Sequence, residues 1–284
     1  MESLFKSLAG LPLPLLHGLG AALGWLAYML SPTYRRRFAT NSRLAGYTPS
    51  QVRGSVAHAG RMVAELPRLW WGAPVPIQWD GVSLIDEAHA SGKGIVFLTP
   101  HLGCFEVTAQ AYAQRYAPQG KAITVLYRPA RKAWLQSLMS QSRHRSGLTA
   151  APATLAGVKT LVKALRSGQA LGILPDQVPP LGLGVWSSFF GQPAYSMTLP
   201  ARLVKQTGAT ILLAWGERLP GGKGYCVHLR PFAKELSDTP EQSAAQINAA
   251  MESLVRECPK QYLWGYARYK QPRADDMLSP PGSL

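Results

Sequence analysis

Cysteine and acidic residues are scarce in this sequence. The three cysteines, Cys104, Cys226 and Cys258, are odd in number, lie far apart and form no C-x-x-C pair. This pattern argues against a disulfide framework and a structural zinc site, and it favours a reducing compartment. Against 15 acidic residues stand 30 Lys and Arg, so the formal net charge is +15. A positive charge of that size gives information about binding partners and not about the fold. Nucleic acid, an anionic membrane surface or a phosphorylated substrate would each be attracted by it.

The shortage of acidic residues is most pronounced between residues 107 and 175, which contain none. A solvated basic face would explain any single basic residue in this stretch. The absence of every compensating carboxylate makes a polyanionic ligand the better interpretation of the whole set. Its ten basic members are Arg115, Lys121, Arg128, Arg131, Lys132, Arg143, Arg145, Lys159, Lys163 and Arg166.

Several catalytic motifs are also missing. The sequence has no G-x-S-x-G elbow, no H-E-x-x-H pair, no Walker loop and no G-x-G-x-x-G fingerprint. These absences disfavour a serine hydrolase of the usual kind, a zinc protease and the common nucleotide sites. We expect no cofactor, and no metal either, since His89 and His144 stand alone in polar stretches.

No charged residue occurs in residues 8–30. As a helix this segment would be about 34 Å long, enough to cross a bilayer core of about 30 Å. Glycine, proline and one histidine dilute it, so a helix embedded in the membrane interface is the main alternative, and a buried helix of a soluble domain is another. Five arginines follow without an intervening acid, which by the positive-inside rule places this flank and the body of the protein in the cytoplasm. They are Arg35, Arg36, Arg37, Arg43 and Arg53.

Short apolar runs alternate with helical patterns along the rest of the chain. The runs typical of strands lie at residues 94–98, 122–127, 170–174, 209–215 and 224–229. The helical patterns lie at residues 106–116, 132–143, 154–166, 199–207 and 240–258. This alternation predicts an α/β fold with a largely parallel sheet flanked by helices.

Residues 99–106, Thr-Pro-His-Leu-Gly-Cys-Phe-Glu, begin where one expected strand ends and run into a helix. Ligand crevices form at such strand ends. On one straight helix His101 and Glu106 would diverge by about 140°, so they meet only if His101 lies on the loop and Glu106 in the first turn. A carboxylate that accepts one imidazole N–H leaves the other nitrogen as a general base. We favour this catalytic interpretation over an incidental polar loop histidine.

Residues 101–106 resemble the H-x4-(D/E) motif of the late acyltransferases of lipid A biosynthesis, within the wider lysophospholipid acyltransferase superfamily. Leu126-Tyr127-Arg128-Pro129 resembles the second block of that family, and residues 172–177, 189–193 and 201–202 resemble the third. Tyr262-Leu263-Trp264 with Arg268 and Lys270 is similar to the C-terminal block. The resemblance covers nearly the whole chain in the right order. The chain differs at Cys104-Phe105, where the family often has Asn-Trp, and in the less polar residues that follow the Asp-Gln pair.

The resemblance implies a fold like that of glycerol-3-phosphate acyltransferases, with a membrane anchor at residues 1–32 and a catalytic domain at 33–272. The proline and glycine content of the C-terminal end predicts a flexible tail at 273–284. His101 would deprotonate the acceptor hydroxyl, Glu106 would orient His101, and the oxygen would attack the thioester of a fatty acyl carrier protein. Arg128 would bind a phosphate or stabilise the oxyanion. The resemblance also assigns Asp176, Gln177 and Arg202 to the substrate site. The acceptor would be a phosphorylated lipid A precursor at the cytoplasmic face of a bacterial inner membrane.

Other functions stay open at this stage. The acceptor could be a glycerolipid, an aminolipid or a glycosylated lipid, or water could take the acyl group, as in a thioesterase. A basic membrane-surface protein without catalysis is the non-enzymatic alternative. We do not expect nucleic acid, because the basic residues are not interleaved with a reading motif. Four aromatic residues could wall an acyl channel or belong to the core: Trp186, Phe189, Phe190 and Tyr195.

Overall fold

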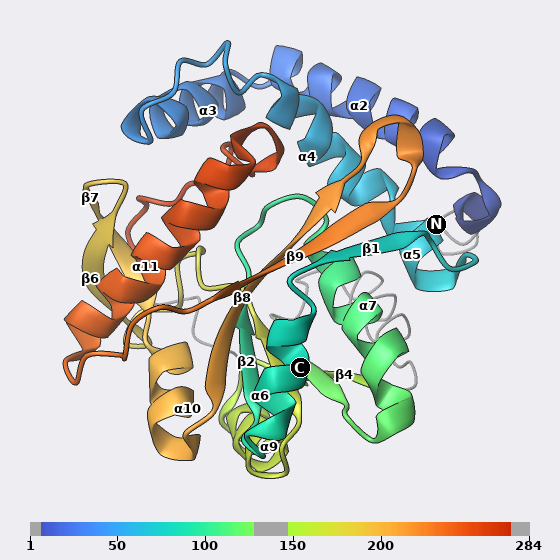
Figure 1. Ribbon diagram of the computed structural model, residues 1–284. Helices are drawn as coiled ribbons and strands as arrows, with labels where there is room; N and C mark the ends of the chain where they lie inside the picture. Colours follow the sequence, from blue (N-terminus) through green and yellow to red (C-terminus); the bar gives the residue numbers. More distant parts are fainter. Residues whose placement is uncertain (1–6, 128–146, 274–284) are drawn as a thin grey trace, which may run out of the picture.

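The computed structural model describes residues 7–127 and 147–273 (Figure 1). The helices are η1 (Leu8–Gly10), α2 (Leu13–Leu30), α3 (Pro32–Leu44), α4 (Gly54–Ala64), α5 (Leu66–Trp71), α6 (Ser83–Ala90), α7 (Phe105–Tyr116), η2 (Ala117–Gln119), α9 (Leu155–Arg166), α10 (Leu199–Thr207), η3 (Pro220–Gly222), α11 (Pro240–Glu257) and η4 (Pro259–Gln261). The strands are β1 (Ile77–Asp80), β2 (Ile95–Leu98), β3 (Ile123–Tyr127), β4 (Leu148–Pro152), β5 (Ala170–Ile173), β6 (Gly184–Phe189), β7 (Gln192–Met197), β8 (Thr210–Arg218) and β9 (Tyr225–Pro231).

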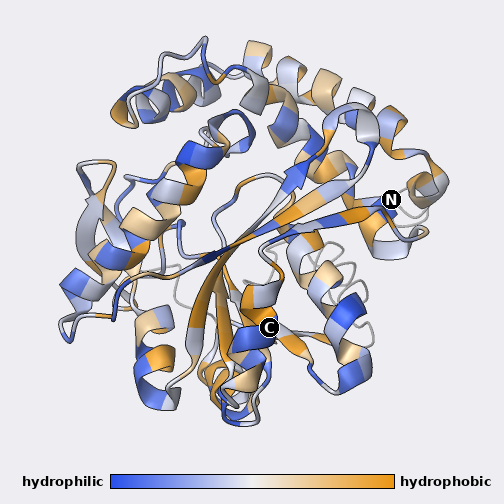
Figure 2. Cartoon of the chain, in the orientation of Figure 1, coloured by the Kyte–Doolittle hydropathy of each residue, from blue (hydrophilic) through white to orange (hydrophobic). Residues whose placement is uncertain are grey.

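A seven-stranded sheet with the order β1-β9-β8-β2-β5-β3-β4 forms the centre of the molecule. Its neighbouring strands are parallel except for β8 and β9, which are antiparallel. Helices α6 and α7 pack on one face, while α9, α10 and α11 pack on the other. The central strands are among the most hydrophobic parts of the chain (Figure 2), because both of their faces are buried under helices. The predicted α/β fold with a largely parallel, mixed sheet is confirmed.

The five expected strands are present as β2, β3, β5, β8 and β9, and four of the expected helices are present as α7, α9, α10 and α11. The expected helix at residues 132–143 lies outside the described residues. The hairpin of β6 and β7 was not expected. Its two-residue turn, Phe190-Gly191, has positive φ at both positions, 46° and 73°. Such turns usually have Asn or Gly at the first of their two positions. Because Phe190 occupies that position, the sequence did not predict the turn.

Helix α2 lies along α4 instead of standing away from the body (Figure 1). Gly20 and Gly24 of α2 face Gly60 of α4, where an added Cβ would lie 1.9 Å from the Gly20 carbonyl oxygen. Small residues of this kind let two helix backbones approach closely. Among the described helices, α2 is the one long and apolar enough to cross a membrane. Its outer side exposes Leu15, Leu19, Leu23, Leu26, Met29 and Leu30.

A buried polar cluster ties α2 to the sheet. Glu65, just after α4, accepts two hydrogen bonds from the guanidinium of Arg218 at the end of β8. It also accepts one from the Tyr225 hydroxyl of β9 at 2.9 Å, and His17 of α2 lies 3.1 Å from the same carboxylate. Burial alone would raise the pKa of Glu65, but the charge of Arg218 and the hydrogen bonds outweigh burial and lower this pKa to about 2. Glu65 and Arg218 therefore form a buried ion pair at neutral pH.

Candidate active site

The candidate site lies where β2 and β5 end side by side. These strands are parallel neighbours, with Leu98 opposite Ile173, and the Thr99 N–H donates to the Ile173 carbonyl at 3.1 Å. The carboxyl ends of parallel strands share one edge of the sheet, where α/β proteins hold their ligands. The chain continues from β2 to His101 and from β5 to Asp176 and Gln177. Sheet pairing thus brings His101 next to two other predicted site residues, Asp176 and Gln177, which lie 75 and 76 positions further along the chain.

Both ring nitrogens of His101 lie within hydrogen-bond distance of a side chain. Nδ1 is 2.7 Å from Asp176 Oδ1, and Nε2 is 3.0 Å from the side-chain nitrogen of Gln177. An ionised carboxylate only accepts, so the proton of a neutral imidazole lies on Nδ1. Nε2 then carries the lone pair, which accepts from the Gln177 amide. A neutral histidine in this tautomer can take a proton at Nε2.

Asp176 is held in a buried position from several sides. The backbone N–H of His101 donates to its Oδ2 at 2.9 Å, and the Tyr262 hydroxyl donates to the same oxygen at 3.3 Å. Burial would raise the pKa of this carboxyl, but the electrostatic interaction and the hydrogen bonds with His101, together with the charge of Arg268, lower it. Burial raises the pKa of Tyr262 far above its usual range, so its hydroxyl stays a donor. Asp176 therefore remains an anion with the geometry to orient His101.

The loop that carries His101 is fixed by backbone hydrogen bonds. The Leu263 N–H donates to the His101 carbonyl at 3.1 Å, and the Cys104 N–H donates to the Gly216 carbonyl at 2.7 Å. Gly103 between them has φ = 57°, and an added Cβ would lie 2.0 Å from the Gly216 carbonyl oxygen. Only glycine fits this left-handed turn with such a close approach. The catalytic candidate therefore lies on a rigid loop.

Glu106 is in the first turn of α7, and His101 is on the loop before it, as the spacing of the motif requires. The carboxylate at His101 Nδ1 is nevertheless that of Asp176. Local spacing suggested Glu106 for this position, but the side-by-side ends of β2 and β5 place Asp176 there. The ring of Phe105 packs edge-on to His101 with centroids 5.1 Å apart, so it covers one side of the imidazole.

The remaining predicted site residues are spread more widely. Arg128 lies outside the described residues, as do Arg131, Lys132, Arg143 and Arg145. Arg202 is exposed on α10, and within the described ranges no hydrogen bond or ion pair joins it to His101. Phe189, Phe190 and Tyr195 are buried in the core, whereas Trp186 is 43% exposed. Tyr262 belongs to the C-terminal block identified in the sequence. Its contact with Asp176 joins residues 86 positions apart, so no nearby sequence pattern predicted it.

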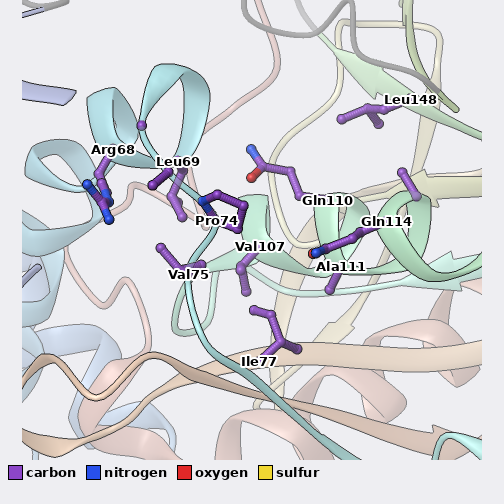
Figure 3. Close-up of a pocket in the computed structure, with 13 residues that line it drawn as sticks. Arg68, Leu69, Pro74, Val75, Ile77, Val107, Gln110, Ala111, Gln114 and Leu148 are labelled. Atoms are coloured by element: carbon purple, nitrogen blue, oxygen red, sulfur yellow. The ribbon is translucent and has the colours of Figure 1, made fainter. Parts of the chain in front are cut away.

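A cavity of about 290 Å³ lies on the flank of α7, and Figure 3 shows its lining. Val107 and Ala111 of α7 face Leu69 of α5 across it. Gln110, Gln114 and Arg68 also line this cavity, which makes it a mixed polar and apolar space. Within residues 7–127 and 147–273, no group of three or more His, Cys, Asp and Glu side chains could hold a metal ion.

The site can accept a proton from a hydroxyl or a water that binds at Nε2 of His101. Such an arrangement at the carboxyl edge of a parallel sheet is typical of α/β transferases and hydrolases that use a general base. The chain belongs to the bacterial lipid A biosynthesis acyltransferase family, whose model matches residues 3–271. It is therefore an acyltransferase of lipid A synthesis.

Individual relatives agree with this family. A lipid A biosynthesis acyltransferase of Haemophilus influenzae is 30% identical over 186 residues, which cover 65% of this chain and 56% of that protein. The lipid A biosynthesis lauroyltransferase of Escherichia coli is 26% identical over 92% of this chain and 87% of its own length. The lipid A biosynthesis myristoyltransferase of the same organism is 26% identical over 86% of this chain and 77% of its own length.

Proposed function

We propose that this acyltransferase moves a fatty acyl chain from an acyl carrier protein thioester to a hydroxyl of a phosphorylated lipid A precursor, with His101 as the general base. The observation that carries the proposal is the pairing of His101 Nδ1 with the buried Asp176 at 2.7 Å, which leaves Nε2 as the basic nitrogen. The acceptor hydroxyl takes the place of the Gln177 amide at Nε2.

In the proposed step, His101 Nε2 removes the proton of the acceptor hydroxyl while the oxygen attacks the thioester carbonyl. The tetrahedral intermediate then collapses, the C–S bond breaks, and the proton on His101 passes to the leaving thiolate. Asp176 stabilises the imidazolium that forms, since its carboxylate is 2.7 Å away and buried. We propose that Glu106 in the first turn of α7 adds negative charge beside the same imidazolium, and that Arg128 binds a phosphate or the oxyanion.

The basic surplus supports both proposed substrates. The ten basic residues between positions 107 and 175 include Lys159 and Lys163, which are exposed on α9. Exposed cations attract an acidic carrier protein and the phosphates of a lipid A precursor through long-range fields. We propose that Gln177 and Arg202 also contact substrate. Higher salt should weaken substrate capture, because exposed charges are screened within about 10 Å at 0.1 M salt.

We propose that the protein works at the cytoplasmic face of a bacterial inner membrane. The outer side of α2 supplies an apolar surface, and Arg36 and Arg37 of α3 are exposed beside the end of this helix. This combination fits an anionic lipid surface, where apolar burial and arginine contacts add to each other.

The test of the proposed base is His101→Ala in the purified full-length protein, with His89→Ala on α6 as the control. Loss of a general base typically lowers turnover by about a hundredfold or more. We expect that loss for His101→Ala, and turnover near that of the parent for His89→Ala. The acylated lipid product is measured by mass spectrometry. Near-parent transfer by the His101 variant would remove this residue from the mechanism.

The same assay separates acyl transfer from hydrolysis. With the acyl carrier thioester and no lipid, the proposed enzyme releases little free fatty acid, whereas a thioesterase releases it at full rate. Supplying glycerolipid, aminolipid and lipid A precursors in turn identifies the acceptor class. Rapid acylation of a glycerolipid with none of the lipid A precursor would contradict the proposed acceptor.

A further inference from the structure

An apolar groove of about 580 Å³ lies alongside the contact of α2 with α4 and is also lined by Leu263, Gly265 and Tyr266, in the segment after Tyr262. Its volume falls within the range of roughly 300–1,000 Å³ that ligand pockets usually have. Among the described residues, no charged side chain lines it, and the hydroxyls of Tyr34 and Tyr266 are the only polar side-chain groups in its lining. The wall that α2 supplies extends from Leu16 to Ala27, about 16 Å at the rise of a helix. An apolar space of this length, with no charge among its described lining residues, suits an extended hydrocarbon chain better than a sugar or a phosphate.

The groove opens on the apolar outer side of α2. Three of its lining residues are also exposed large hydrophobic residues: Leu19 at 47%, Leu23 at 60% and Val63 at 61%. The same surface continues along α2 to Met29 and Leu30. A hydrocarbon chain can therefore pass from a lipid layer at this surface into the groove without crossing water.

The inner end of the groove touches the chain segment that holds the candidate site. Leu263 lines the groove, and its N–H donates to the His101 carbonyl at 3.1 Å. Tyr266 also lines the groove, and its hydroxyl accepts from the Val178 N–H at 3.0 Å, two residues after Asp176. A hydrocarbon chain in the groove would thus contact residues that are hydrogen-bonded to His101 itself or to the segment after Asp176. The α7 cavity, by contrast, is lined by Arg68 and two glutamines, so it is less suited to a hydrocarbon.

We propose that this groove binds an acyl chain of the lipid acceptor and thereby holds the acceptor hydroxyl near His101. The inference rests on the proposed function, since it names how one substrate of that reaction is held. The side from which a hydrocarbon chain enters the groove indicates whether the chain belongs to the donor or to the acceptor. A donor chain arrives on a soluble carrier protein, whereas a groove that opens on the apolar side of α2 receives a chain that already belongs to a lipid.

The test fills the groove without touching the site. Ala27 lines the groove and is exposed on α2, so Ala27→Trp blocks the space at little cost to folding. Ala22 is also exposed on α2 but lies outside the groove lining, so Ala22→Trp is the matched control. Ala59→Leu on α4 narrows the groove from the other side and serves as a second, milder variant. Thermal unfolding of each purified variant confirms that it is folded.

We expect Ala27→Trp to raise the KM for the lipid acceptor about tenfold or more, with kcat and the KM for the acyl carrier thioester nearly unchanged. Ala59→Leu should act in the same direction, and Ala22→Trp should match the parent. A rise in the KM for the donor, or a changed preference for donor chain length, would assign the groove to the donor and overturn the proposal. Parent-like kinetics of both groove variants would also overturn it.

A second readout does not need the reaction. Phosphatidylglycerol with a diazirine in one acyl chain, mixed into vesicles with the parent protein, should crosslink to the peptide that contains Leu263 and Tyr266. Lipid A precursor should compete, and Ala27→Trp should remove this crosslink while Ala22→Trp keeps it. If the crosslink forms but no acyl transfer occurs in the parent, the proposed function fails and the groove stands. If transfer occurs and the crosslink is missing, the groove proposal fails alone.

Discussion

Asp176 and Glu106 compete for the role of the carboxylate that orients His101. Glu106 is near in sequence and follows the histidine into α7, whereas Asp176 is 75 positions away and hydrogen-bonds the imidazole directly. Two oxygens of Asp176 hold both the ring and the backbone N–H of His101. A two-point contact of this kind fixes the direction of the ring as well as its tautomer.

Replacing Asp176 by Asn should lower kcat by about a hundredfold or more, with a small change in KM. The amide keeps the shape of the side chain, but it can no longer stabilise an imidazolium at Nδ1. Glu106→Gln should impair turnover through the same step. Single-turnover kinetics with saturating substrates would measure both variants. If Asp176→Asn turns over like the parent, the local pair of His101 and Glu106 carries the step by itself.

Much of the site could be predicted from the sequence, because His101 and Asp176 each follow an apolar run that reads as a strand. Parallel strands end at one edge of a sheet, which brings a residue after the run at 94–98 near a residue after the run at 170–174. The choice of the carboxylate could not be predicted. It depends on β2 and β5 being direct neighbours with Leu98 opposite Ile173. That pairing is decided by the packing of the whole sheet, and no local spacing encodes it.

Among the elements, α2 and α4 depend on their glycines for contact. In the sequence, Gly20 and Gly24 only lower the hydrophobicity of a possible membrane helix. In the structure they are the surface against which Gly60 packs. The partner glycine lies about 40 residues further along, in a helix that was not expected, so the sequence offered no signal for the pair.

Gly60→Ala should destabilise the protein by about 2 kcal/mol or more, because the new methyl group meets backbone atoms of α2 that have no rotamer to change. Gly18→Ala is the matched control: it adds a methyl group to α2 at a point where no atom of the described residues outside this helix lies within 4 Å. That change should be neutral or stabilise by up to about 1 kcal/mol. Thermal unfolding in a mild detergent measures both. Equal midpoints for the two variants would show that the helices can separate freely.

Acid should weaken the connection between α2 and the sheet. The pKa of Glu65 is lowered from 4.5 to about 2 in the folded protein, so the unfolded chain binds more protons in this range. The stabilisation is complete above pH 4.5 and is lost as the pH falls towards 2. Its slope is at most about 1.4 kcal/mol per pH unit for one proton. Unfolding midpoints between pH 6 and pH 3 should fall less steeply for Glu65→Gln, although that variant is less stable at pH 6. An unchanged slope would mean that Glu65 is not ionised in the folded state.

At the scale of the whole molecule, the exposed arginines of α3 directly follow the helix that has the apolar outer side, α2. Removing the two exposed charges in Arg36→Gln/Arg37→Gln should weaken binding to vesicles of anionic phospholipid by roughly thirtyfold, at about 1 kcal/mol per arginine. The double variant Lys159→Gln/Lys163→Gln removes the same charge from α9 and should bind like the parent. Vesicle co-sedimentation at low and high salt measures both. Equal losses would mean that net charge, and not the position of the α3 arginines, governs binding.

The length of contact between α2 and α4 has a consequence for how the molecule can move on a lipid layer. A membrane helix that is attached to a domain by one end alone is a flexible tether, and it leaves the domain free to take many orientations above the membrane. A helix fastened along its side, with glycines in backbone contact and His17 joined to Glu65, gives no such freedom. Once α2 lies on a surface, the tilt and height of the sheet edge above it are set. The protein and a lipid of that layer then meet by lateral diffusion in the plane of the layer. The sheet edge keeps one orientation during this search, so the search has two dimensions and not three.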